Sequence, residues 1–331
     1  MDELNLNWDS NTLFKMVETS KDTLAGKIED YLKSDLIVFD CPIGRASFER
    51  FGSVLNETHT KSKWNNDSLG IIINTNGGKP EYVSQLVQLI RQLYTNVIFI
   101  VYECALSSGT LFCFSGNKLY MNNTSYLGAL DLQITEFKSS WELTKKHVDR
   151  ILSKVPKEIR DDFCKGMEYD INNKIHTNVR VDAKKYLTTY HQWDGISEEA
   201  REKLLLLPDI LTDNELMKAN GIKDHEFPIV ISHAKSLGLN VRNYQEKDVE
   251  LYDLINKLYD TIIAENLLKQ SYKIPPEFNF IYSRNSRNNR RFEMMDTTVD
   301  NNDGAIDYID KESVCRYPKP AHFIAWSIRQ K

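Results

Sequence analysis

Residues 69–110, LGIIINTNGGKPEYVSQLVQLIRQLYTNVIFIVYECALSSGT, decide the fold class of this chain. Two apolar runs, at 69–74 and 96–101, flank a segment at 81–94 whose apolar residues recur at helical spacing. Apolar strands that alternate with helices form parallel βαβ units with right-handed crossovers. This stretch therefore predicts an α/β fold built on a mostly parallel sheet.

The sequence on either side extends the same pattern. Residues 36–39 and 118–121 are short apolar runs typical of strands buried on both faces, whereas residues 52–67 are rich in Asn, Ser, Thr and Lys and predict a loop. Residues 140–270 show a mostly helical pattern. The residues after 270 include a stretch of arginines among asparagines. We predict three parts: an N-terminal helical segment at 1–33, the α/β domain at 34–270 and a C-terminal extension of unknown role at 271–331.

Composition and charge exclude several classes of protein. The chain has 331 residues and a formal net charge of −5, so it can bury a sizeable core, and its charge gives no reason to expect nucleic acid as the main partner. No apolar run is long enough to cross a bilayer, and the first residues lack the features of a secretory signal, so we expect no membrane span and a cytoplasmic location. The cysteines form no CxxC pair, which argues against a disulfide framework and against a metal site: Cys41, Cys104, Cys113, Cys164 and Cys315.

Ser107 is the candidate nucleophile. It lies in ALSSGT, residues 105–110, where a predicted strand turns into an apolar helix. A serine hydroxyl reacts when a base removes its proton and N–H donors hold the developing oxyanion. The amides of Ser108, in the first helical turn, and of Gly77 and Gly78, at the end of the neighbouring strand, can supply those donors. Serine also caps helices and Asn-Gly-Gly also forms plain turns, but their pairing at the ends of consecutive strands favours an active site.

Four sequence elements, taken in order, resemble the serine dehydrogenase proteinase family. Its usual pattern runs Thr-Pro-Gly-Gly, Ser-Ala-Gly-Thr, Leu-Gly-Pro-x-Asp-Pro-Gln and, later, His-Asp-Tyr-Pro-Ile. The family is distantly similar to Clp protease subunits and to signal peptide peptidases, and the resemblance covers roughly residues 34–265. The matching elements are TNGG at 75–78, SSGT at 107–110, LGALDLQ at 127–133 and KDHEFPI at 223–229.

The resemblance implies a Clp/crotonase-like fold and a Ser-Asp-His triad. On the matching positions, Ser107 is the nucleophile, Asp131 the orienting acid and His225 the general base. Histidine suits the role of base because its ordinary pKa lies near working pH. No dinucleotide fingerprint is present, so we expect no cofactor. The chain departs from the family pattern where three prolines are replaced, by Asn76, Ala129 and Leu132.

A lysine base is the main mechanistic alternative. Signal peptide peptidases of related fold use a Ser–Lys dyad, in which burial lowers the pKa of the lysine toward neutrality. Three lysines follow the active-site strands at a suitable distance, although the charged run at 145–150 is also typical of a solvated helix face: Lys138, Lys145 and Lys146. Three other histidines are weaker candidates with no supporting motif: His147, His191 and His233.

These observations predict a serine peptidase or hydrolase that acts on a peptide or protein substrate. Two alternatives stay open: a crotonase-like acyl-CoA enzyme, whose enolate the same amides would hold, and a catalytically silent scaffold that binds peptides. Folds of this kind commonly form symmetric assemblies, so we expect a homo-oligomer, and a partner ATPase or a regulator of the site stays an open alternative. We interpret the arginine-rich stretch at 282–292 as a solvated loop, or as a contact with an acidic neighbour, rather than as a site that binds nucleic acid.

Overall fold

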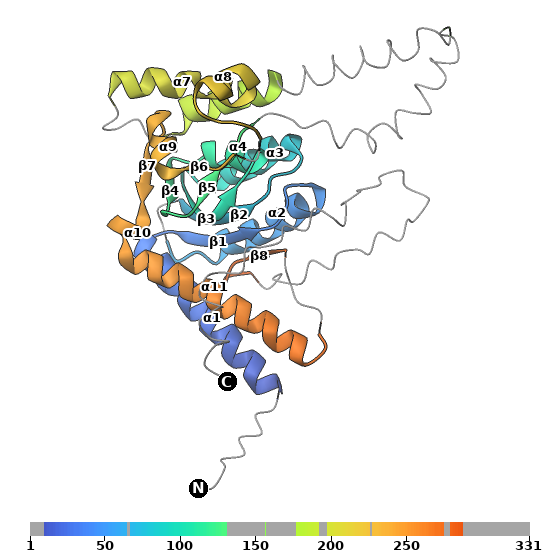
Figure 1. The fold of residues 1–331 in the computed structure, drawn as a ribbon. Coiled ribbons are helices and arrows are strands. Elements are labelled where there is room, and N and C mark those ends of the chain that lie inside the picture. Colours follow the sequence, from blue (N-terminus) through green and yellow to red (C-terminus); the bar gives the residue numbers. More distant parts are fainter. Residues whose placement is uncertain are drawn as a thin grey trace, which may run out of the picture. The chain divides into compact units, whose positions relative to one another are not determined.

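The structure is a computed structural model that describes residues 10–64, 67–130, 156, 177–191, 197–225, 227–274 and 279–286 (Figure 1). The described helices and strands belong to one unit, which residues 1–133 and 166–292 form. Residues 177–189 are also helical. The bounded elements are, in chain order, α1 (Ser10–Leu32), β1 (Asp35–Asp40), α2 (Arg45–Thr60), β2 (Ser68–Thr75), α3 (Pro80–Leu93), β3 (Asn96–Ala105), α4 (Ser108–Phe114), β4 (Lys118–Met121), β5 (Tyr126–Leu127), α7 (Glu198–Thr212), α8 (Asn214–Ala219), β6 (Ile229–Val230), α9 (Ile231–Ser236), β7 (Val241–Asn243), α10 (Tyr244–Lys247), α11 (Val249–Ser271) and β8 (Phe280–Tyr282).

The described strands form one eight-stranded sheet. Its main path runs β6-β5-β3-β2-β1-β8, and β4 pairs with both β3 and β7. The pairs of β1 with β2, of β2 with β3, of β3 with β4 and β5, and of β4 with β7 are parallel. The pairs of β1 with β8 and of β5 with β6 are antiparallel. The predicted α/β fold with a mostly parallel sheet is confirmed.

Helices cover both faces of the central strands, as Figure 1 shows. On β1, Ile37 and Phe39 join a core that includes side chains of α2, α3 and α4. Leu36 and Val38 point the other way and join a second core with side chains of α1 and α11. Because both faces of β1 and β2 are buried, their sequences are continuous apolar runs without the alternation of a half-exposed strand.

The helix α2 corrects one expectation. The polar composition of residues 52–67 predicted a loop, but α2 extends to Thr60. Its buried side chains include Phe51, Val54, Leu55 and Thr58, which lie three or four residues apart and therefore form one stripe against the sheet. The prediction was wrong because this narrow stripe is flanked by polar residues that face solvent.

Elements from distant parts of the chain lie next to β1. The helix α1 packs along α11, with Lys21 Nζ 2.6 Å from Glu265 Oε2 in a partly buried ion pair. The strand β8 pairs with β1 through Phe39 and Ile281. The predicted domain boundaries, at residues 33 and 270, stay predictions.

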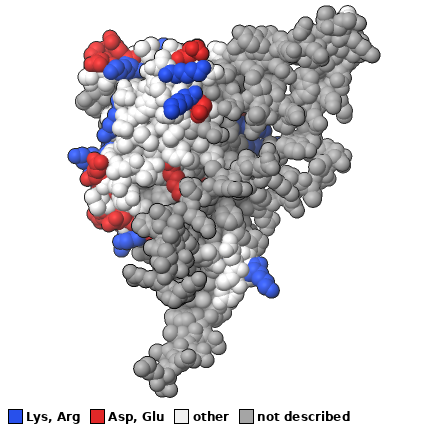
Figure 2. Space-filling view, viewed as in Figure 1, with Lys and Arg blue, Asp and Glu red and all other residues white. Residues whose placement is uncertain are grey.

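Charges of both signs lie side by side on the surface seen in Figure 2, notably over α7 and α8 at its top. There the Lys203 ammonium lies 2.9 Å from the Glu199 carboxylate and the Lys218 ammonium 3.3 Å from the Glu215 carboxylate. Exposed pairs of this kind contribute little to stability, because solvent screens them. None of the described helices is both long enough and apolar enough to cross a membrane.

Candidate active site

Ser107 occupies a strained turn between β3 and α4. Its backbone angles are φ 48° and ψ −116°, and a positive φ is unfavourable for a residue that has a Cβ atom. Ser107 stands at the N-cap position of α4, yet its hydroxyl makes no capping hydrogen bond. The capping interpretation of this serine therefore does not hold. A strained strand-to-helix turn whose half-buried hydroxyl makes no hydrogen bond to another described residue has the geometry of a nucleophile elbow.

Hydrogen bonds behind Ser107 hold the turn in place. The Leu106 amide donates to the Thr75 carbonyl oxygen at 2.9 Å, which fastens the turn to β2. The Thr110 hydroxyl lies 2.7 and 2.9 Å from the carbonyl oxygens of Ala105 and Gly128, between which its one hydrogen is shared, and accepts from the Gly128 amide at 3.0 Å. One buried hydroxyl thus connects β3, α4 and the segment after β5.

A second loop, at Gly77 and Gly78, packs directly against the Ser107 turn. Both glycines have positive φ, 92° and 139°. A Cβ atom on Gly77 would lie 2.5 Å from the Leu106 carbonyl oxygen and 3.0 Å from Ser107 Cβ. A side chain at this position would therefore collide with the turn, so glycine is required for the two loops to touch.

The segment after β1 anchors the glycine loop. The Ile43 amide donates to the Gly77 carbonyl oxygen at 2.7 Å, and the Lys79 amide donates to the Ile43 carbonyl oxygen at 2.9 Å. A Cβ atom on Gly78 would lie only 2.1 Å from the Ile43 carbonyl oxygen. Three chain segments, which follow β1, β2 and β3, therefore meet at the carboxyl edge of the sheet.

The backbone amides where these three segments meet differ in whether they already donate a hydrogen bond. The Gly77 amide donates to the Thr75 hydroxyl at 3.1 Å. The amides of Gly78 and Ser108, by contrast, have no acceptor within the part of the chain that the structure describes. The Ser108 hydroxyl donates to the Gly78 carbonyl oxygen at 2.7 Å and so connects the two residues. Two available donors beside a half-buried hydroxyl can hold an oxyanion during acyl transfer.

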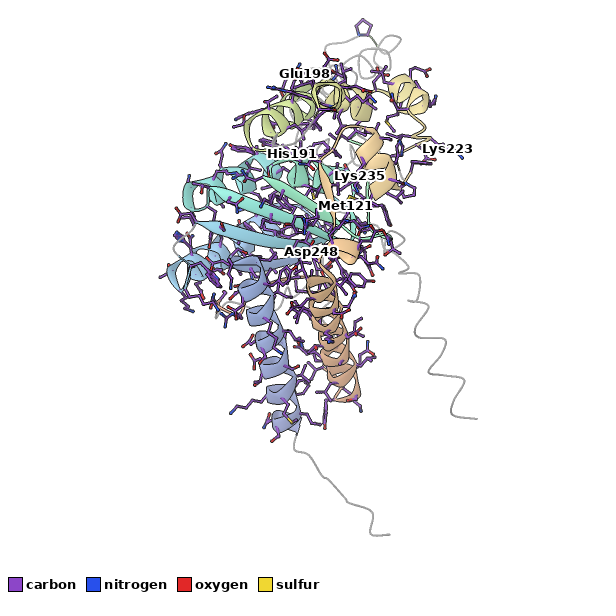
Figure 3. All side chains as sticks on the ribbon, turned by 90° about the vertical axis from the view of Figure 1, so that its left-hand side faces the viewer. Met121, His191, Glu198, Lys223, Lys235 and Asp248 are labelled. Atoms are coloured by element: carbon purple, nitrogen blue, oxygen red, sulfur yellow. The ribbon has the colours of Figure 1, made fainter. Side chains whose placement is uncertain are left out.

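Of the other two residues of the predicted triad, the structure describes only His225. Asp131 lies outside the described residues, as do the alternative bases Lys138, Lys145 and Lys146. His225 is half-buried in a turn between α8 and β6. Lys223, two residues earlier, projects outward from the same connection in Figure 3.

Strand register connects these chain segments to the Ser107 turn. Ala105 of β3 pairs with Leu127 of β5, and Leu127 pairs with Ile229 of β6. Because β5 is parallel to β3 and β6 is antiparallel to β5, the chain after Ala105, the chain after Leu127 and the chain before Ile229 leave this row in the same direction.

The remaining histidines differ from His225 in their surroundings. His191 follows the helix at 177–189 and is only 4% exposed, in the region of α7 and the sheet in Figure 3. Its burial lowers the pKa to about 4. The His233 ring nitrogen Nε2 lies 2.9 Å from the Asn220 carbonyl oxygen. His147 lies outside the described residues.

Sequence reasoning missed two polar side chains that shape the site. The Thr75 hydroxyl donates to the Cys41 carbonyl oxygen at 2.7 Å while it accepts from the Gly77 amide. Asn74 is buried at the end of β2 and bonds to side-chain and main-chain atoms of both neighbouring strands. Polar residues that end an otherwise apolar strand, directly before Gly-Gly, were the available signal.

Metal ligation has no visible basis in this part of the chain. Among the described residues, no group of three or more His, Cys, Asp or Glu side chains could hold a metal ion. Three cysteines in the described ranges are free and buried, and burial raises the pKa of Cys41 and of Cys113.

Comparison with known proteins identifies the family. The family model described as ClpP-like SDH-type serine proteinase matches residues 54–277, more than half of the chain. The uncharacterised protein MJ0137 of Methanocaldococcus jannaschii is 25% identical over 189 residues, which cover 56% of this chain and 58% of that protein.

Solved structures of ClpP proteases are also similar. A ClpP1 variant from Listeria monocytogenes is 13% identical with a TM-score of 0.36, over 65% of this chain and 94% of that one. The ClpP catalytic domain from Plasmodium falciparum is 11% identical with a TM-score of 0.38, over 67% and 89% of the two chains. On the match of the family model, the chain belongs to the ClpP-like SDH-type serine proteinases.

Proposed function

We propose that this protein is a serine peptidase in which Ser107 attacks the substrate carbonyl. The observation that carries the proposal is the strained backbone of Ser107, with φ 48°, together with the absence of a capping bond from its hydroxyl. Strain of this kind costs on the order of 1–3 kcal/mol and persists where the surroundings over-determine it, as at active sites. Membership of a serine proteinase family supports the same conclusion.

The amides of Gly78 and Ser108 would hold the oxyanion. They are the two donors beside Ser107 that have no acceptor among the described residues, whereas the Gly77 amide is already bonded to Thr75. Preorganised amides lower the barrier because charge develops on the carbonyl oxygen only in the transition state. Of the predicted Gly77, Gly78 and Ser108 hole, we therefore assign the donors to Gly78 and Ser108.

His225 and Asp131 are our candidates for general base and orienting acid. The register that pairs Ala105 with Leu127, and Leu127 with Ile229, supports this choice. It directs the chain after Ala105, the chain after Leu127 and the chain before Ile229 from one row of the sheet toward the same edge. A Ser–Lys dyad with Lys138, Lys145 or Lys146 is the competing mechanism.

The choice of base has a direct test. His225→Gln keeps a polar side chain but removes the titrating group, so we expect peptide turnover to fall by about a hundredfold or more. Single Lys→Gln variants at the three lysines should keep turnover near that of the wild type. Loss of turnover in one lysine variant, with His225→Gln fully active, would favour the dyad.

Hydrolysis of a fluorogenic peptide or of casein tests the proposed activity. We expect turnover by the wild type and none above background for Ser107→Ala. Ser115→Ala, at the other end of α4, is the matched control because Ser115 is buried and its hydroxyl bonds only to the Phe112 carbonyl oxygen in the described structure. Equal turnover by wild type and Ser107→Ala would refute the proposal and favour a silent peptide-binding scaffold.

Self-association is a further part of the proposal. Large apolar side chains are exposed along the α1–α11 pair, among them Met16 at 52% and Leu267 at 50%. Exposed apolar side chains that gather into one patch are typical of surfaces that another protein covers. We expect a homo-oligomer in light scattering, and a monomer at micromolar concentration would contradict this.

A further inference from the structure

The strand β3 carries two extra residues just before the candidate nucleophile. Ile73 of β2 pairs with Val101 of β3, but the next pair is Thr75 with Ala105, so β2 advances by two residues while β3 advances by four. Such a bulge interrupts the ladder of hydrogen bonds and re-aims the residues that follow. Ser107 follows two residues after Ala105.

The side chain of Asn74 supplies a hydrogen bond between β2 and β3 where the bulge interrupts the main-chain ladder. Asn74 Oδ1 accepts from the Cys104 amide at 3.3 Å, a main-chain donor within the bulged part of β3. Its Nδ2 donates to Asp40 Oδ2 at 3.1 Å, and Asp40 is the register partner of Asn74 on β1. One amide side chain therefore connects the carboxyl ends of β1, β2 and β3. Asn74 and Asp40 are 6% and 7% exposed.

These bonds lie directly beneath both halves of the candidate site. Asn74 stands three residues before Gly77, and Cys104 stands three residues before Ser107. The bond between Asn74 and the Cys104 amide thus sets the spacing of the two chain segments from which the oxyanion donors and the nucleophile extend. Reactions of held groups are sensitive to displacements of about 1 Å, which can cost about a hundredfold in rate.

We propose that the Asp40–Asn74 pair is a positioning device that holds the bulge of β3 and thereby aligns Ser107 with the amides of Gly78 and Ser108. The inference rests on the proposed function, because it assigns a role in the same reaction. Asp40 fixes the orientation of the Asn74 amide: the carboxylate accepts only from Nδ2, which leaves Oδ1 for Cys104.

The surroundings of Asp40 are consistent with this role. Burial raises the pKa of Asp40 to about 7, and the charge of Glu103 on β3 adds to the rise, whereas the hydrogen bond from Asn74 opposes it. Tyr259 of α11 is buried beside the same carboxyl and stacks on Tyr102 of β3, with ring centroids 3.5 Å apart. The hydrogen bond from the Asn74 amide stabilises the charged form of Asp40 there, and the Tyr259 hydroxyl acts in the same direction.

Exchanging the two side chains tests the proposal. Asn74→Asp removes the donor and places a second carboxyl opposite Asp40 and close to Glu103. We expect it to lower the rate of labelling by a fluorophosphonate, and kcat on a peptide, by about tenfold to a hundredfold with KM nearly unchanged. Asn74→Asp/Asp40→Asn keeps an acceptor oxygen for Cys104 and restores an amide–carboxylate bond between the two positions, so labelling should return to within about threefold of the wild type.

Exchange of amide hydrogens supplies a readout that does not need activity. In the wild type and the double variant, the Cys104 amide should be protected in mass spectrometry of peptides that span residues 102–106. In Asn74→Asp it should exchange at least about tenfold faster than in the wild type, because its acceptor faces a second carboxyl. Asn56→Asp, which adds a carboxyl at an exposed position of α2, controls for the change in net charge.

The outcomes separate this inference from the proposed function. Absence of labelling in the wild type would contradict the proposed function. The difference in Cys104 amide exchange between the wild type and Asn74→Asp would then test whether the Asp40–Asn74 pair holds the bulge. Labelling of Asn74→Asp at the wild-type rate, or a folded double variant that labels as slowly as Asn74→Asp, would overturn the inference. If Asn74→Asp does not fold, the labelling rate and amide protection of the double variant decide.

Discussion

The Ser108 hydroxyl donates a 2.7 Å hydrogen bond to the Gly78 carbonyl oxygen. This bond joins the two chain segments whose amides are available beside Ser107, and Ser108 is only 3% exposed. The two adjacent serines therefore differ in their contacts: the hydroxyl of Ser107 makes no hydrogen bond within the described residues, and that of Ser108 is bound to the opposite loop.

Removal of the Ser108 hydroxyl should loosen the hole without removing its donors. For Ser108→Ala we expect a loss of about 1 kcal/mol in the free energy of unfolding, typical of one neutral hydrogen bond, and a fall in turnover of about three- to tenfold. Ser115→Ala should show a similar loss of stability with unchanged turnover. Urea unfolding and peptide hydrolysis provide the two measurements, and equal turnover of both variants would contradict the role given to Ser108.

Gly77→Ala should inactivate the site by collision. Its new Cβ atom would lie 2.5 Å from the Leu106 carbonyl oxygen, at a residue with φ 92°. We expect a loss of about 1–2 kcal/mol in stability from the backbone conformation and loss of most fluorophosphonate labelling. Gly44→Ala is the matched control, because Gly44 has φ −167° and a Cβ atom there would meet nothing within 4 Å. Normal labelling of Gly77→Ala would show that the two loops do not need this contact.

The buried carboxyl of Asp40 should make stability depend on pH. Its pKa is raised from the ordinary value to about 7 by burial, so between about pH 4 and pH 7 the folded protein holds a proton that the unfolded chain releases. The stability contributed by this group is therefore present at low pH and is lost as the pH rises through 7.

Asp40→Asn removes that titration. Between pH 5.5 and pH 8, the decrease in the free energy of unfolding should be smaller in the variant than in the wild type, by on the order of 2 kcal/mol. Asp30→Asn should leave the wild-type slope unchanged. Parallel stability curves for wild type and Asp40→Asn would show that Asp40 is ionised across this range.

A buried ion pair connects the segment after β8 to α1. The Arg284 guanidinium lies 2.6 Å from Glu29 Oε2, and the side chain of Glu29 is 1% exposed. Arg284→Met would leave the Glu29 carboxylate buried without its cation, so we expect a loss of about 3–5 kcal/mol in thermal or urea unfolding. Glu29→Gln/Arg284→Met should recover part of this loss, since the charge that needs compensation is gone. An equally unstable double variant would locate the effect in packing rather than in charge.

Sequence reasoning succeeded where burial alone decides structure. The strands β1, β2 and β3 are buried on both faces and flank or follow amphipathic helices, so apolar runs and helical spacing were sufficient to predict them. The strands β5 and β6 contain two residues each, too few for any periodic signal. They form because their neighbours in the sheet offer hydrogen bonds, and a single sequence does not show that pairing.

The residues of the candidate site also differ in whether the sequence alone could reveal them. Ser107 and the two glycines are recognisable from local motifs at strand ends. The roles of Asn74 and Asp40 depend on register between strands that are distant in sequence, and on two extra residues in β3. No local pattern encodes that relationship, so it emerged only from the fold.

Covalent labelling of the full chain by a fluorophosphonate, located by mass spectrometry of proteolytic peptides, tests the central claim most directly. The account predicts one adduct, on Ser107, in the wild type, and no adduct in Ser107→Ala. The control Ser115→Ala should be labelled as fast as the wild type. Labelling at a different residue, or equal labelling of wild type and Ser107→Ala, would contradict the claim that Ser107 is the nucleophile.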